Sequence, residues 1–113
     1  MTSTEPMTYN PGPEFDRRIA NLIGYVSMTT AVNLDGTYGY TPAYSTTWEG
    51  MRLVVEEMQR RGWDLGLFTD HEGWLAEFII LENGSLAKGR AETAPHAVCL
   101  ACIAAIEGQK KEV

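Results

Sequence analysis

The chain has 113 residues, 44% hydrophobic and 21% charged, which is typical of one globular domain rather than a disordered or membrane-spanning chain. Nine basic and fifteen acidic residues give a net charge of −6, which argues against binding to nucleic-acid polymers, because phosphates need a clustered positive surface. No apolar run is long enough to span a membrane and no basic leader precedes one, so we expect a cytoplasmic protein without membrane contact.

Proline and glycine mark the start of the predicted domain. Residues 1–12, MTSTEPMTYNPG, hold few apolar groups, and we expect a flexible tail there, followed by one domain over residues 13–113. Pro13 suits the first turn of a helix, and Gly24 suits its end. Between them, one apolar stripe at helical spacing consists of Phe15, Ile19, Leu22 and Ile23.

The segment 26–44 has weaker signals. Asp35-Gly36 is a turn pair that permits a small irregular hairpin. Three tyrosines, Tyr38, Tyr40 and Tyr44, stand at nearly alternate positions after it. They either cover an edge of the core or form a recognition surface.

A second helix follows a predicted capping box of Thr46 and Glu49 and ends at Gly62. Its predicted buried stripe is Trp48, Met51, Val54, Val55 and Met58. The opposite face is charged, and we expect it in water with ion pairs Glu56–Arg60 and Glu57–Arg61.

Three strands come next. WDLGLFT (63–69) and WLAEFIIL (74–81) flank the polar turn DHEG, and Asn83-Gly84 is a strong hairpin signal before SLAKGRAE (85–92). The polar alternation of the third segment favours a more exposed or edge position. The order predicts an α+β, sandwich-like fold, in which a three-stranded antiparallel meander packs with helices in the order helix, irregular segment, helix, three strands, helix.

The last segment, TAPHAVCLACIAAIEG (93–108), contains a histidine and two cysteines. Thr93 as N-cap and Pro95 in the first turn place Cys99 and Cys102 too deep in a helix to share its N-terminal dipole, which redox cysteines use. Structural zinc would need more ligands than this stretch offers. We therefore predict core cysteines with no metal and no cofactor, in a helix covered on a second side by another layer of the chain or by a homo-oligomer interface.

Several of these stretches resemble a family of small phage and prophage proteins built on a phage alpha-beta-alpha sandwich domain. The matching stretches are IANLIGY, PAYSTTWEGMRLVVEEMQRRGW, WLAEF and AETAPHAVCLACIAAI. The resemblance implies the fold, a phage origin and a place in the host cytoplasm. It implies no catalytic residues, because the family is mostly without assigned activity.

No set of catalytic residues stands out in the sequence, so we expect a binding protein rather than an enzyme. His71 lies beside Asp70 and Glu72, but an exposed polar turn needs no catalysis to explain it. The order of elements also matches a double-stranded RNA-binding domain, yet the last helix begins without lysine and the first turn between strands is acidic.

Two functions are consistent with these features. The leading hypothesis is a counter-defence sponge that sequesters a nucleotide-like host signal, and the predicted ligand site is Tyr38, Tyr40, Tyr44, Trp48, Lys88 and Arg90. The rings would stack on a base and the two cations would face phosphate. The alternative is a protein–protein interaction module that inhibits a host factor or self-assembles through its apolar C-terminal helix.

Overall fold

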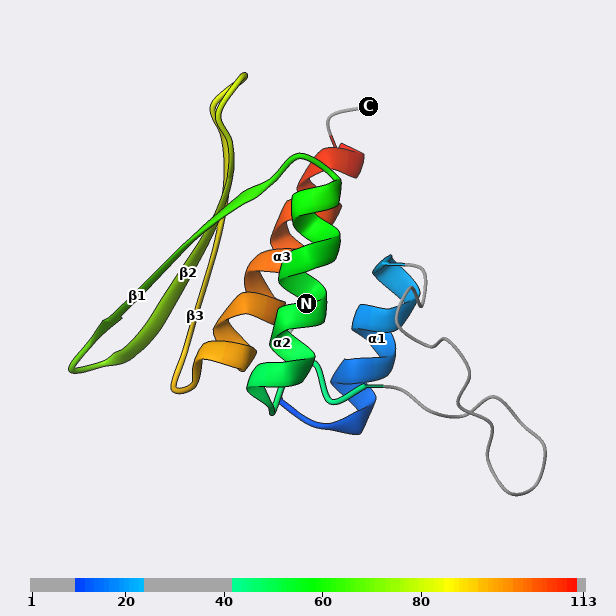
Figure 1. The fold of residues 1–113 in the computed structure, drawn as a ribbon, viewed down its shortest axis with the longest axis vertical. Helices are drawn as coiled ribbons and strands as arrows, with labels where there is room; N and C mark the ends of the chain where they lie inside the picture. Colours follow the sequence, from blue (N-terminus) through cyan, green and yellow to red (C-terminus); the bar gives the residue numbers. More distant parts are fainter. Residues whose placement is uncertain (1–9, 24–41, 112–113) are drawn as a thin grey trace, which may run out of the picture.

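Three helices and one three-stranded antiparallel sheet make up the described part of the chain (Figure 1). The structure, a computed structural model, describes residues 10–23 and 42–111. Its elements are α1 (Pro13–Ile23), α2 (Trp48–Arg60), β1 (Asp64–Asp70), β2 (Gly73–Ile80), β3 (Ser85–Ala91) and α3 (Ala94–Lys111). The predicted fold class and element order are confirmed. The Asp35-Gly36 hairpin, Tyr38 and Tyr40 lie outside the described residues.

The sheet is a simple meander in the order β1-β2-β3. Leu67 pairs with Ala76 between β1 and β2, and Ala76 pairs with Gly89 between β2 and β3. Among the described strands, β3 takes the predicted edge position and β1 forms the other edge. Gly84 has a φ of 75°, the left-handed conformation that glycine adopts without strain in the predicted turn.

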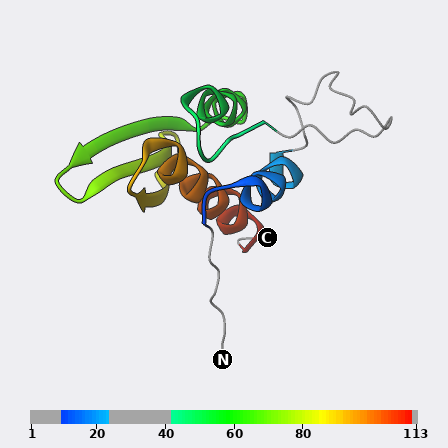
Figure 2. The same ribbon diagram turned by 90° about the horizontal axis from the view of Figure 1, so that it is seen from below.

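The three described helices lie on one side of the sheet (Figures 1 and 2). The side chains that β2 turns toward them are buried or packed on the core, namely Trp74, Ala76, Phe78 and Ile80. Leu65 and Leu67 of β1 pack on the same core. Because side chains alternate along a strand, the intervening residues form a second face that points away from the helices. None of these three helices is long and apolar enough to cross a membrane.

Helix α3 is the central element of the fold. It contacts β2 and β3 on one side and α1 and α2 on the other, and Figure 2 shows it between the sheet and α1. The residues buried along it are Ala94, Ala97, Val98, Cys99, Ala101, Cys102, Ile103, Ala105 and Ile106. The second apolar side, which was predicted to serve either packing within the chain or self-assembly, is therefore covered within the chain by α1 and α2.

Helix α2 begins one residue later than predicted. Thr47, not Thr46, is the N-cap, and its hydroxyl accepts a hydrogen bond from the Gly50 backbone N–H. Met51, Val54 and Met58 are buried as predicted. The prediction that Trp48 belongs to the buried stripe was wrong, because 56% of its surface is exposed. Its ring packs edge-on against Trp74.

Small residues allow α3 to lie close to the sheet. A Cβ atom added to Gly89 of β3 would lie 2.5 Å from the Ala101 backbone nitrogen and closer still to the Ala97 carbonyl oxygen. Neither neighbour is a flexible side chain that could move aside. Glycine at this position and alanine across from it thus set the distance between helix and sheet.

Gly89→Ala is expected to lower the free energy of unfolding by about 1–3 kcal/mol or more, because the added methyl group forces α3 away from β3. Gly108→Ala is the matched control, since a Cβ there meets nothing within 4 Å. Because alanine favours the helix over glycine, this change should raise the free energy of unfolding by at most about 1 kcal/mol. Urea unfolding of both variants measures the difference. Equal stability of the two variants would contradict the close contact.

Candidate functional site

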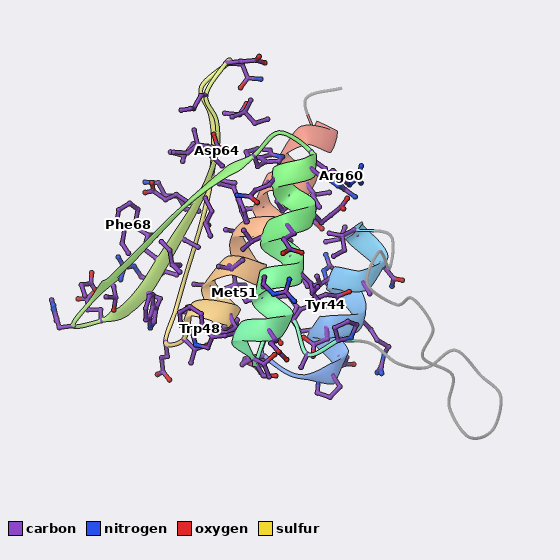
Figure 3. All side chains as sticks on the ribbon, viewed as in Figure 1. Tyr44, Trp48, Met51, Arg60, Asp64 and Phe68 are labelled. Atoms are coloured by element: carbon purple, nitrogen blue, oxygen red, sulfur yellow. The ribbon has the colours of Figure 1, made fainter. Side chains whose placement is uncertain are left out.

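The structure does not bring the described members of the predicted ligand site together. Tyr44 is fully buried between α1 and α2, and Trp48 is exposed at the start of α2 (Figure 3). Lys88 and Arg90 lie on β3 and alternate with the buried Ala87 and Gly89, so they point away from the helices. The sheet therefore separates the two cations from the two rings.

A hydrogen-bond network attaches the segment that carries Tyr44 to α1. The neighbouring Ser45 donates to Asp16 Oδ1 from its backbone N–H at 2.9 Å and from its hydroxyl at 2.6 Å. The Gly12 N–H donates to the same hydroxyl. Together these bonds attach the turn before α2 to α1. Ser45 and Asp16 resemble a nucleophile and its base, but they are 0% and 4% exposed, so the pair holds the fold together rather than meeting a substrate.

The two cysteines are packing residues in the structure. Both are free thiols with no exposed surface, and Cys102 Sγ lies 3.8 Å from Met58 Sδ of α2. Burial raises the pKa of the Cys102 thiol to about 12 and holds the pKa of Cys99 well above its ordinary value. Thiols in this state are poor nucleophiles and poor metal ligands. In residues 10–23 and 42–111, no three His, Cys, Asp or Glu side chains lie where they could hold a metal ion.

Near the end of α2 lies a buried carboxylate that helical periodicity did not predict. Glu57 is only 4% exposed, although its position predicted a place in water. It accepts hydrogen bonds from Arg60 Nε (2.9 Å) and Nη2 (2.5 Å) and from Arg61 Nε (2.8 Å). These bonds lower the pKa of the Glu57 carboxyl, and the hydrogen bonds from Arg60 have the largest effect. The predicted Glu57–Arg61 pair is confirmed, whereas Glu56 pairs with Arg52 instead of Arg60.

Among the described residues, a hollow of about 90 Å³ lies between β3 and the end of α3, where Trp63, Ala87 and Ala104 line it. It is far smaller than a nucleotide site. Another hollow, of about 320 Å³, lies beside the start of α2, and its lining residues are Pro42, Ala43, Thr47, Glu49, Gly50, Arg52 and Leu53. The described members of the predicted ligand site line neither hollow.

The face of the sheet that points away from the helices, hereafter the open face, gathers apolar and charged side chains. Its residues are Asp64, Gly66, Phe68 and Asp70 of β1, Leu75, Glu77 and Ile79 of β2, and Leu86, Lys88 and Arg90 of β3. Phe68 and Leu86 are 53% and 51% exposed, and Figure 3 shows Phe68 pointing away from the helices. No described helix covers this face.

Local contacts order the open face. The strand register aligns Phe68, Leu75 and Arg90 in one row across the sheet and Gly66, Glu77 and Lys88 in the next. The Phe68 ring bends over Gly66, where it would lie 3.1 Å from an added Cβ. Arg90 Nη1 reaches past Gly73 to Asp70 Oδ1 at 3.3 Å, an exposed pair that contributes little stability.

One signal in the sequence points to this face. WLAEFII has apolar residues at both alternating sets of positions, so β2 carries apolar side chains on its outer face as well as on the core. A strand with only one buried face would have polar residues at Leu75 and Ile79. His71, the other polar candidate, is 88% exposed in the turn beside it, with Nε2 3.7 Å from Glu72 Oε2.

Comparisons with known proteins place the fold more firmly than the function. No protein-family model and no curated protein matches the chain. A crystal structure of a phage protein from Bacillus cereus is similar over 93% of this chain and 100% of its own, with a TM-score of 0.61 and 22% identity. A phage protein thus shares the fold. Membership of the alpha-beta-alpha sandwich family stays a prediction.

Glu57→Gln should lower the free energy of unfolding by about 1–2 kcal/mol at pH 7, because it removes the charge that both arginines bind. The effect is not larger, because solvent around Arg60 weakens that ion pair. Since the pKa of the carboxyl is lowered in the folded protein, the ion pair stabilises the fold fully at pH values above the ordinary carboxyl pKa of 4.5 and stabilises it less as the pH falls. The deficit of the variant should therefore shrink below about pH 4.5. Chemical unfolding at several pH values measures it.

Glu56→Gln is the control, since the exposed Glu56–Arg52 pair should change stability by no more than about 0.5 kcal/mol. A pH-independent deficit for Glu57→Gln would contradict the ion-pair account.

Proposed function

We propose that the protein is a phage-encoded, non-enzymatic binding protein that acts through protein–protein contact at the open face of its sheet. The observation that carries the proposal is that half-exposed Phe68 and Leu86 flank Leu75 and Ile79 on a face that no described helix covers. Exposed apolar surface bordered by charged side chains is typical of protein interaction sites.

The composition of the open face supports contact with a protein. Four apolar side chains stand among three acidic and two basic ones, which leaves this face one negative charge out of the net −6 of the chain. The face is therefore nearly neutral in an acidic protein. Low net charge and an exposed aromatic ring favour close association with another folded surface.

Sequestration of a nucleotide-like host signal is less well supported by the geometry. A nucleotide site needs aromatic rings and cations around one concave surface. The exposed ring of Trp48 and the cations Lys88 and Arg90 lie on opposite sides of the sheet, and Tyr44 is buried. Contact with a protein needs no such cavity.

The structural roles of the reactive groups support binding over catalysis. Ser45, Asp16 and both cysteines are buried in packing or in hydrogen bonds that join elements. The phage protein with the same fold supports a phage origin, and with it a place of action in the host cytoplasm. A host factor and a second copy of the chain are both candidate partners.

Photo-crosslinking tests the proposal. With p-benzoylphenylalanine in place of Phe68, irradiation of the protein, purified or in host lysate, should yield a covalent adduct with a protein, because this ring is an exposed part of the proposed contact. The same amino acid in place of Arg52, exposed on α2, should yield none. No adduct at position 68, or equal adducts at both positions, would overturn the proposal.

A thermal-shift series separates the sponge from this function. Linear and cyclic nucleotides are expected to leave the melting temperature unchanged. A rise that grows with nucleotide concentration, and that Trp48→Ala abolishes, would favour sequestration instead.

A further inference from the structure

We propose that the partner on the open face is a second copy of the chain, related to the first by a two-fold axis that runs along the strands. This inference rests on the proposed function, since it names the occupant of the same face. Its basis is the distribution of charge over the three strands.

The charges of the open face are sorted by strand. Those of β1, Asp64 and Asp70, are acidic, and those of β3, Lys88 and Arg90, are basic. The central strand carries Glu77, directly opposite Lys88. The acidic residues thus lie on β1 and the basic ones on β3, with Arg90 also paired to Asp70 of its own chain at 3.3 Å, so the face is complementary to a copy of itself in a suitable orientation.

Two symmetric orientations are available when two such sheets stack face to face. An axis across the strands lays β1 on the partner's β1 and β3 on the partner's β3, which places like charges together. An axis along the strands lays β1 on the partner's β3 and the reverse, which places Asp64 and Asp70 one row of the sheet away from the partner's Lys88 and Arg90. Charge complementarity selects the second orientation.

The rows of the sheet fit this orientation. Gly66, Glu77 and Lys88 form one row, so the partner's Lys88 comes to lie above Gly66, where the Phe68 ring is bent. The Lys88 stem can pack on this ring while its ammonium group reaches Glu77. Each Glu77 then has a lysine on both sides, which offsets the approach of the two Glu77 carboxylates near the axis.

The size of the face sets the expected affinity. Strands of seven or eight residues at about 3.4 Å per residue, spaced about 4.8 Å apart, make a face about 24 Å long and about 14 Å wide. Two copies stacked on it would bury on the order of 1,000 Å² in total, the lower limit for specific interfaces. We therefore expect a reversible dimer with a Kd in the micromolar range.

Sedimentation equilibrium of the purified protein is the first test, with a concentration-dependent rise in mass from monomer to dimer expected. In the double variant Asp64→Lys/Asp70→Lys, the charged residues of both edge strands are basic. In the double variant Lys88→Glu/Arg90→Glu, the charged residues of both edge strands are acidic. Each alone should dimerise at least about tenfold more weakly than wild type, while an equimolar mixture should form heterodimers close to wild-type affinity. Melting temperatures confirm that each variant is folded.

A cysteine at the axis tests the geometry. Leu75→Cys lies on the central strand, close to its own mate across the axis, and a short bis-maleimide should join two chains. Leu81→Cys, 76% exposed in the turn after β2, should not be joined. The native cysteines are buried and do not compete.

Wild-type protein that stays monomeric at about 500 μM, well above a micromolar Kd, would overturn the dimer. So would charge-reversed variants that dimerise as wild type does, or equal cross-linking at positions 75 and 81. A monomer that still forms an adduct with a host protein through position 68 would retain the proposed function and reject this inference alone.

Discussion

The close contact between α3 and β3 orders the rest of the molecule. Gly89 has no side chain, and Ala97 and Ala101 across from it are small, so the helix lies almost against the strand. Helices α1 and α2 then pack on the side of α3 that faces away from the sheet and complete its burial. Since the described helices all gather on this side, the opposite face of the sheet has no described layer to cover it. The proposed interaction surface is therefore a consequence of how the core is built.

Much of the fold follows from local signals. Short apolar runs bounded by turn residues predicted the first two strands, and polar alternation predicted the third. Asn83-Gly84 predicted the second turn, and the all-round apolar character of α3 predicted its burial on two sides. The errors came from tertiary packing. Trp48 occupies a helical position of the buried stripe but lies exposed at the start of α2, and Glu57 lies on the charged face of α2 but is only 4% exposed. Spacing along the helix predicts the Glu57–Arg61 ion pair but neither the exposure of Trp48 nor the burial of Glu57.

The candidate site was harder to predict because it depends on which side of the sheet the helices take. Lys88 and Arg90 lie exposed on the third strand, but their separation from Trp48 by the sheet appears only once the helices are placed. The two-sided apolar pattern of β2 was present in the sequence and is equally consistent with a strand buried on both faces. Residue type alone cannot distinguish a covered outer face from one that awaits a partner.

Thiol labelling of the native protein tests most directly whether α3 is the buried centre of the fold. With the pKa of Cys102 raised to about 12 and both sulfurs inaccessible, an aromatic disulfide reagent at pH 8 should react only as fast as the protein unfolds, and the reaction should accelerate in Gly89→Ala. Both thiols should react at once in denaturant. Immediate reaction of either thiol without denaturant would show that α3 is open to solvent and would contradict the account.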